Sequence, residues 1–284
     1  MGVTMTTRSP YRIQMNNNMV NTPVDLEALN AMRRRGEKIA CLTCYDASFT
    51  RVLESAGVDL FIIGDSLGMV LLGYTSTAPV TMDDMVYHAS SVARVGRHSY
   101  RVVDLPKGSY STPGQALGNA GRLMTAGGAH MVKLEGGTAM AATVEYLANH
   151  DIPVCGHIGL LPQSVSQPGD YRVQGRDAEA AAAILADARA LQDAGAGLLV
   201  MECIPAQLGA AVTAAVSIPT IGIGAGPDCD GQVLVLHDML GITMGKLPRF
   251  VQDFLADAGS IPAAIAAYVR AVKDGSYPAA RHCY

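Results

Sequence analysis

The chain has 284 residues, of which 49% are hydrophobic and 16% charged, so it can bury a large core and is not a disordered protein. Its net charge of −4 excludes the basic surface that nucleic-acid-binding proteins carry. Residues 203–227 contain no charge, but Pro205 and Pro219 divide them into pieces too short to span a membrane as one helix. We therefore expect neither a nucleic-acid partner nor a membrane partner.

Eight segments rich in β-branched and apolar residues follow one another along the chain and predict strands. They are residues 38–46, 59–65, 99–106, 130–136, 153–160, 197–203, 219–226 and, more weakly, 232–239. Helical segments are predicted between most of them, over residues 48–57, 81–95, 112–128, 138–150, 177–196 and 205–216, and again over 248–274. The seventh and eighth predicted strands are too close together for a full helix between them.

Strands that alternate with helices pair in parallel. Eight such units match a single (β/α)₈ TIM-type barrel, with a doubly wound open sheet as the alternative. We expect residues 1–24 to be a flexible N-terminal leader without a signal peptide, and residues 25–284 to form one catalytic barrel domain. Residues 26–36 predict an N-terminal helix that closes the bottom of the barrel, with Arg33–Arg35 on its solvated face.

Six cysteines are scattered along the chain, at positions 41, 44, 155, 203, 229 and 283. This spacing favours free thiols in a reducing compartment over a disulfide framework, so we expect a cytoplasmic location. Cys41 and Cys44 form a C-x-x-C pattern. An offset of three within a strand points the two side chains to opposite faces, which argues against a redox or metal-binding pair.

Polar side chains stand at the ends of six predicted strands. They are Asp46, Asp65 with Ser66, Asp104, Lys133 with Glu135, His157 and Glu202. A parallel barrel brings all strand ends to one rim, where barrel enzymes have their active sites. A single acid there could merely cap the next helix, and we assign that role to Asp46. The other acids would repel one another unless a cation lay among them.

The residue types at this rim favour magnesium chemistry. Asp65, Asp104 and Glu135 are hard oxygen ligands without an accompanying thiol or histidine pair, which favours Mg²⁺ over Zn²⁺. Lys133 shares a strand face with Glu135 and could neutralise a substrate carboxylate. Glu202 ends an apolar strand, where burial would raise its pKa toward that of a useful general base.

A series of short motifs in order along residues 24–268 resembles the ketopantoate hydroxymethyltransferase family. The motifs are GDSLGM (64–69), PVT (79–81), DLP (104–106), MVKLEGG (131–137), CGHIGL (155–160), PQS (162–164), VQGR (173–176), IGIGAG (221–226), DGQ (230–232) and HD (237–238). The fold that this resemblance implies is a (β/α)₈ barrel, in agreement with the alternation of strands and helices.

The resemblance implies a transferase of pantothenate biosynthesis. Such an enzyme moves a hydroxymethyl group from methylenetetrahydrofolate to 3-methyl-2-oxobutanoate and gives ketopantoate and tetrahydrofolate. The reaction would pass through an enolate of the keto acid that Mg²⁺ stabilises. The resemblance also implies a large homo-oligomer, a decamer.

The resemblance further implies roles for particular residues. Asp65 and Asp104 would bind Mg²⁺, with Glu135 reaching the ion directly or through water. Glu202 would accept the C3 proton of the keto acid, and His157 would have a supporting role. The keto acid itself would be held by four side chains: Asp65, Ser66, Asp104 and Lys133.

The sequence departs from the usual family pattern at Thr75, at Lys107-Gly108 and at Asp170, all in predicted loops near the rim. These changes leave open whether the folate donor or the substrate tail is recognised in the usual way. Three other readings also stay open. They are another Mg²⁺-dependent keto acid barrel of the phosphoenolpyruvate mutase and isocitrate lyase type, a phosphate site at Gly222, Gly224 and Gly226, and a non-catalytic relative.

Overall fold

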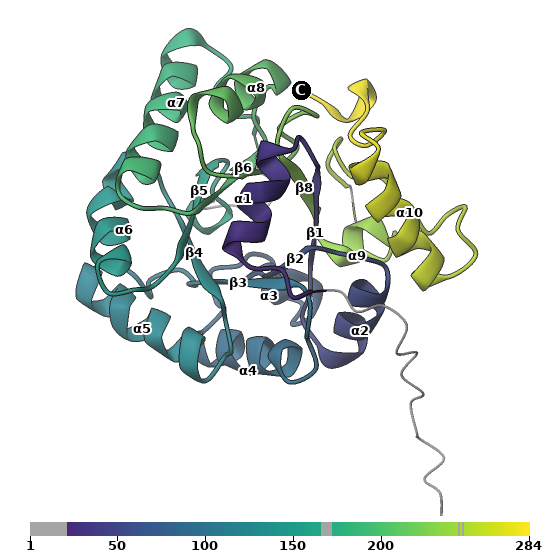
Figure 1. Cartoon of the computed structure of the whole chain (residues 1–284), viewed down its shortest axis with the longest axis horizontal. Helices are drawn as coiled ribbons and strands as arrows, with labels where there is room; N and C mark the ends of the chain where they lie inside the picture. Colours follow the sequence, from purple (N-terminus) through teal and green to yellow (C-terminus); the bar gives the residue numbers. More distant parts are fainter. Residues whose placement is uncertain (1–21, 166–171, 244, 246) are drawn as a thin grey trace, which may run out of the picture.

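The computed structural model describes residues 22–165, 172–243, 245 and 247–284. Its centre is a closed barrel of eight parallel strands in chain order, which confirms the predicted (β/α)₈ fold and excludes the open sheet (Figure 1). The strands are β1 (Ile39–Thr43), β2 (Leu60–Ile63), β3 (Tyr100–Asp104), β4 (Met131–Glu135), β5 (Val154–Gly159), β6 (Leu198–Glu202), β7 (Thr220–Ile223) and β8 (Gly231–Leu234).

Helices surround the barrel in the order of the chain (Figure 1). They are α1 (Leu26–Arg34), α2 (Ala47–Ser55), α3 (Leu67–Val70), α4 (Met82–Ala93), α5 (Pro113–Thr125), α6 (Ala141–Ala148), α7 (Ala178–Asp193), α8 (Ala206–Ala215), α9 (Leu236–Met239) and α10 (Ile261–Lys273). The short 3₁₀ helices are η1 (Thr138–Met140), η2 (Pro162–Ser164) and η3 (Ala280–His282). Within the described part of the chain, no helix is long and apolar enough to cross a bilayer.

Local sequence signals explain where several helices begin. The side chain of Asp46 accepts hydrogen bonds from the backbone N–H groups of Ser48 and Phe49, so the predicted cap of α2 is confirmed. Thr81 and Asp84 form a reciprocal capping box at the start of α4. Such caps satisfy backbone donors that a helix cannot pair internally.

Two predicted elements are shorter in the structure. The eighth strand ends at Leu234, because the Leu236 N–H donates to Thr43 Oγ1 at 2.8 Å and the chain turns into α9 instead of extending to residue 239. Of the helices predicted over residues 248–274, the structure has α10 alone, which begins at Ile261, where Ser260 caps it; residues 248–260 are not helical. Apolar content alone could not place either boundary.

The N-terminal helix closes one end of the barrel, as predicted. This helix, α1, lies across one end of the barrel (Figure 1). Its residues Leu29 and Met32 pack into the barrel interior. The interior cluster also contains inward side chains of all eight strands: Ile39, Cys41, Leu60, Ile62, Tyr100, Val102, Met131, Cys155, Leu198, Val200, Ile221 and Val233. Cys44 lies in the other cluster, between strands and helices, so the opposite-face prediction for the C-x-x-C pattern is confirmed. All six cysteines are free thiols.

Residues 1–21 of the predicted leader lie outside the described residues. Val24, its last residue, donates its backbone N–H to the His98 carbonyl at 2.7 Å, so the chain is already attached to the barrel there.

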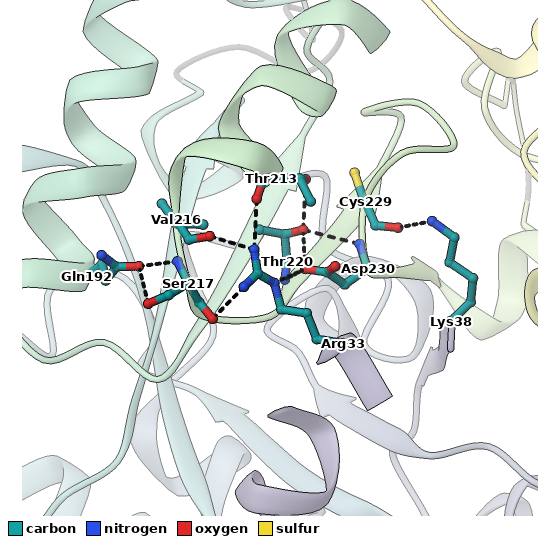
Figure 2. A network of polar contacts seen from close by, with 9 residues as sticks. All are labelled: Arg33, Lys38, Gln192, Thr213, Val216, Ser217, Thr220, Cys229 and Asp230. Carbon is teal, nitrogen blue, oxygen red and sulfur yellow. Dashed lines mark hydrogen bonds and ion pairs between the residues drawn. The ribbon is translucent and has the colours of Figure 1, made fainter. Parts of the chain in front are cut away.

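Arg33 corrects the prediction that all three arginines of α1 face solvent. Its Nε donates to Asp230 Oδ2 at 2.9 Å, and its other nitrogens donate to the carbonyls of residues 213, 216 and 217 at the end of α8 (Figure 2). A cation at a helix C-terminus is favourable, but the charge pattern of α1 cannot reveal which helix ends beside it. Arg34 and Arg35 do pair with acids at the exposed surface, as predicted.

Candidate active site

The inward face of the strands changes from apolar to polar toward the C-terminal rim. On β3 the inward residue after Val102 is Asp104, and on β6 the inward residue after Val200 is Glu202. Strands β4 and β5 repeat this change with Lys133, Glu135 and His157. Because side chains two residues apart share a strand face, the same alternation that fills the barrel also assembles the site.

Asp65, Asp104 and Lys133 meet at this rim. Asp65 lies just after the end of β2, and its backbone N–H donates to Asp104 Oδ2 at 3.1 Å. Lys133 Nζ is 3.0 Å from Asp104 Oδ1. All three side chains are buried. Two carboxylates and one ammonium from three neighbouring strands are therefore enclosed together.

His157 connects this group to the candidate base. Its Nε2 is 3.2 Å from Glu202 Oε2, and its Nδ1 is 3.5 Å from Glu135 Oε1 and 3.3 Å from Lys133 Nζ. The polar side chains of β3 to β6 thus form one continuous series of contacts, which the backbone N–H of Asp65 joins at Asp104. Glu202 is the more accessible acid, with 14% of its side chain exposed against 3% for Glu135 and Asp104.

Enclosure of these charges shifts their pKa values. Burial raises the pKa of Asp65 well above its usual value, and the charges of Asp104 and Glu135 raise it further. Burial also raises the pKa of Asp104, against the opposing effect of Lys133. For Glu135, burial raises the pKa but the hydrogen bond and charge of His157 outweigh it, so the net shift is downward.

For the two cationic side chains, burial lowers the pKa and the neighbouring acids raise it. Burial lowers the pKa of Lys133, but the neighbouring carboxylates, Asp104 first, outweigh it and the net shift is upward. Burial and Lys133 lower the pKa of His157, but its contacts with Glu135 and Glu202 outweigh them. The carboxylates outnumber the cations at this rim, which favours an additional cation.

Gly64 lets the chain pack closely beside the acids. A Cβ added to Gly64 would lie 2.9 Å from Ser66 Oγ and 3.5 Å from Asp104 Oδ2, so a side chain at this position would displace the Ser66 hydroxyl. Ser66 makes no capping hydrogen bond to α3, and its Oγ instead lies 2.9 Å from the hydroxyl of Tyr45. The glycine before Asp65 thus allows the Ser66 hydroxyl and the Asp104 carboxylate to lie close together at the rim.

The two aspartates fit the requirements of Mg²⁺, which commonly uses one or two carboxylates and keeps several waters. Within the described ranges, no three acidic, histidine or cysteine side chains form a ready-made metal-binding cluster. The oxygens of Glu135 face His157 Nδ1 and the backbone N–H of Gln163. A contact of Glu135 with the ion through water fits this arrangement better than direct ligation.

Sequence reasoning assigned no role to Gln163, although it lies in the PQS motif. Its side-chain Nε2 donates to Asp65 Oδ2 at 2.9 Å, and its backbone N–H donates to Glu135 Oε2 at 3.0 Å. The hydroxyl of Tyr110 donates to Gln163 Oε1 at 2.6 Å. The PQS motif could have singled out Gln163 as a candidate. Its contacts could not be read from the motif, because the residues it touches lie on or after other strands.

The space beside the glycines of IGIGAG is occupied by packed side chains rather than open to a phosphate. A Cβ on Gly222, Gly224 or Gly226 would lie within 2.7 Å of a side chain of Cys229, Phe250 or Ala206, respectively. This close packing favours the structural reading of the motif.

Of the residues that depart from the family pattern, Lys107 and Gly108 line a cavity of about 170 Å³ together with Tyr110 and Gln163. Thr75 lies in the exposed segment before α4, and Asp170 lies outside the described residues.

The barrel is similar to barrels of known structure. It is similar to a putative phosphonomutase from Burkholderia cenocepacia J2315, with 19% identity, a TM-score of 0.57 and coverage of 75% of this chain and 94% of that chain. An oxaloacetate acetylhydrolase has 15% identity and a TM-score of 0.57, with coverage of 89% and 99%. At these identities the likeness establishes the barrel fold alone.

The family follows from closer relatives. The model of the family described as ketopantoate hydroxymethyltransferase matches residues 23–280. The 3-methyl-2-oxobutanoate hydroxymethyltransferase of Thiobacillus denitrificans is 59% identical over 263 residues, which cover 92% of this chain and 100% of the relative. That of an Azoarcus species is 58% identical, with coverage of 92% and 97%. The chain belongs to the ketopantoate hydroxymethyltransferase family and is an enzyme, which confirms the resemblance seen in its motifs.

Proposed function

We propose that the enzyme transfers a hydroxymethyl group from methylenetetrahydrofolate to 3-methyl-2-oxobutanoate, giving ketopantoate and tetrahydrofolate in pantothenate biosynthesis. The names of the close relatives support this reaction. The observation that carries it is the continuous series of contacts from Asp104 through Lys133 and His157 to Glu202. It supports the proposal, because the charges that would hold the substrate and the carboxylate that would act as base lie at one end of the barrel.

The keto acid would bind among the polar side chains of the C-terminal rim. Ser66 Oγ would supply a hydrogen-bonding group, and the ammonium of Lys133 would attract the substrate carboxylate. Asp65 and Asp104 would hold Mg²⁺, and Glu135 would reach it through water. The ion would supply positive charge that stabilises the negative charge developing on the keto oxygen.

Glu202 would accept the C3 proton of the keto acid. Its Oε2 lies 3.2 Å from His157 Nε2, and its partial exposure leaves the carboxylate accessible. Loss of this proton makes C3 a nucleophile that forms a bond with the methylene carbon of the folate donor. Before this bond forms, water adds to the methylene carbon, both of its C–N bonds break as the two folate nitrogens each take a proton, and tetrahydrofolate and formaldehyde result. When C3 adds to the formaldehyde carbon, the formaldehyde oxygen takes the proton held by Glu202 and becomes the hydroxyl.

Proton exchange tests this assignment without the folate donor. Wild-type enzyme with Mg²⁺ and 3-methyl-2-oxobutanoate in D₂O should lose the C3 proton signal in NMR spectra. Glu202→Gln keeps the shape but removes the base, so exchange should fall by roughly 10²-fold or more while keto acid binding survives. Glu179→Gln, which removes the same charge from an exposed site on α7, should exchange like wild type.

Adding methylenetetrahydrofolate to the same assay distinguishes the remaining hypotheses about the reaction. Exchange followed by formation of ketopantoate supports the proposal. Exchange without product would instead indicate an enzyme with another electrophile, such as the phosphoenolpyruvate mutase and isocitrate lyase type, and would direct attention to Lys107, Gly108 and Thr75. Binding of the keto acid without exchange would indicate a non-catalytic relative.

A further inference from the structure

Gln163 is a buried amide at the centre of the acid cluster. It lies in η2, just after β5, with 4% of its surface exposed. Its side chain contacts a carboxylate that follows β2, a carbonyl that follows β3 and a hydroxyl from the β3–α5 loop, while its backbone N–H contacts a carboxylate of β4. The proposed reaction gives this residue no task.

The partners of Gln163 fix the orientation of its amide. Nε2 donates to Asp65 Oδ2 and to the carbonyl of Leu105, both at 2.9 Å. Oε1 accepts from the hydroxyl of Tyr110 at 2.6 Å. An ionised carboxylate and a carbonyl can only accept hydrogen bonds, so a flipped amide would place Oε1 against two oxygens. The amide therefore has one favourable orientation.

The neutrality of the amide matters for Asp65. Lys133 pairs with Asp104 and offsets part of its negative charge, whereas Gln163 gives Asp65 a hydrogen bond without offsetting its charge. The negative charge of Asp65 is thereby kept available for a cation. The backbone N–H of the same residue holds Glu135, so one residue sets the positions of two acids from separate strands.

We propose that Gln163 is a positioning residue, oriented by Tyr110, that holds Asp65 and Glu135 in the arrangement that binds the divalent cation and the keto acid. The identity of the keto acid rests on the proposed function, but the arrangement of the acids does not. Partners that orient metal-binding groups commonly change metal affinity or activity by 10–100-fold when they are replaced.

The first test measures Mg²⁺ binding without any substrate. Gln163→Met keeps the length of the side chain but removes its donor and acceptor, and isothermal titration calorimetry should show Mg²⁺ affinity reduced about 10–100-fold. Gln232→Met is the matched control, because Gln232 is equally buried and donates to the Gly226 carbonyl, away from the acids. Both variants lose a buried hydrogen bond, but the control should bind Mg²⁺ like wild type.

Two further variants test the orientation of the amide. Gln163→Glu keeps the shape but replaces the donor to Asp65 by an oxygen, so it should bind Mg²⁺ no better than Gln163→Met. Tyr110→Phe removes the hydroxyl that orients Oε1 and should cause a smaller loss of affinity. In the exchange assay, the KM for the keto acid should rise more than the rate at saturation falls, because these residues position binding groups.

Equal Mg²⁺ affinities for Gln163→Met and Gln232→Met would overturn the proposal, whatever their melting temperatures. If Gln163→Met does not fold, wild-type Mg²⁺ affinity in both Gln163→Glu and Tyr110→Phe would overturn it in the same way. Failure of the proposed function has a different signature. In that case wild type binds Mg²⁺ and the variants bind it more weakly, but wild type neither binds nor exchanges the keto acid.

Discussion

Asp65 shows how a single residue can favour function at the expense of stability. Its carboxylate is buried beside two other acids, and its pKa in the folded protein is raised well above that in the unfolded chain. The folded state therefore prefers the protonated form. As the pH rises above about 4 and through the folded-state pKa, ionisation of Asp65 increasingly destabilises the fold. A bound cation would offset this penalty.

Asp65→Asn should consequently stabilise the metal-free enzyme. In EDTA at pH 7 the variant should have a higher melting temperature than wild type, and the difference should shrink as the pH is lowered toward 4. The asparagine oxygen can still accept the hydrogen bond from Gln163 Nε2. Thermal unfolding followed by circular dichroism measures the difference, with the exposed Asp257→Asn as control.

Mg²⁺ should reverse this order of stability. It should raise the melting temperature of wild type, because a ligand that binds only the folded state stabilises it, but it should not raise that of Asp65→Asn. A wild-type protein as stable as the variant in EDTA at pH 7 would show that the charge of Asp65 is already compensated by its neighbours.

At the scale of elements, α1 stabilises the end of the barrel opposite the site. No helix lies between β7 and β8, and the short connection is held instead by Arg33 and by Asp230, which accepts from the Thr220 N–H and hydroxyl (Figure 2). Lys38 adds hydrogen bonds to the carbonyls of Pro227 and Cys229. Helix α1 thus fills the end of the barrel opposite the site and, through Arg33, stabilises the connection between β7 and β8.

Arg33→Met should destabilise the protein by roughly 2–3 kcal/mol, because it leaves Asp230 and three carbonyls without their charged partner. Arg34→Met, one position along α1, removes only an exposed pair with Glu27 and should change stability by less than about 1 kcal/mol. Urea denaturation measures both values. The exchange activity of folded Arg33→Met should match wild type, and a reduced activity would contradict this separation of roles.

At the scale of the whole molecule, stability and chemistry occupy opposite ends of one barrel. The apolar interior and α1 fill the N-terminal end, and the charged side chains gather at the C-terminal end. Charged groups at the rim can therefore be replaced without removing the packing that forms the fold.

The assembly of the enzyme is a prediction from the family alone. We expect a large homo-oligomer, a decamer, in solution. Size-exclusion chromatography with multi-angle light scattering measures the mass directly. A monomer that persists at micromolar concentration would refute the prediction without affecting the assignment of the site.

Sequence by itself determined the succession of strands and helices along the chain and the acids of the rim. Alternation of apolar residues, caps such as Asp46 and the polar strand ends are properties of near neighbours in the chain. In a parallel barrel, all strand ends meet at one rim, so Asp65, Asp104, Lys133, Glu135 and Glu202 could be placed together before any distance was known. The position of the Cys41 and Cys44 side chains followed from the same alternation.

Tertiary structure alone decided the contacts of Gln163, the buried role of Arg33 and the end of β8. Gln163 meets Asp65 98 positions earlier in the chain, and Arg33 meets Asp230 197 positions later. The amide of Leu236 is taken by Thr43, whose strand is the first of the barrel. Such partners are set by the closure of the barrel rather than by local pattern, because closure brings distant side chains within hydrogen-bonding distance irrespective of their separation in the chain.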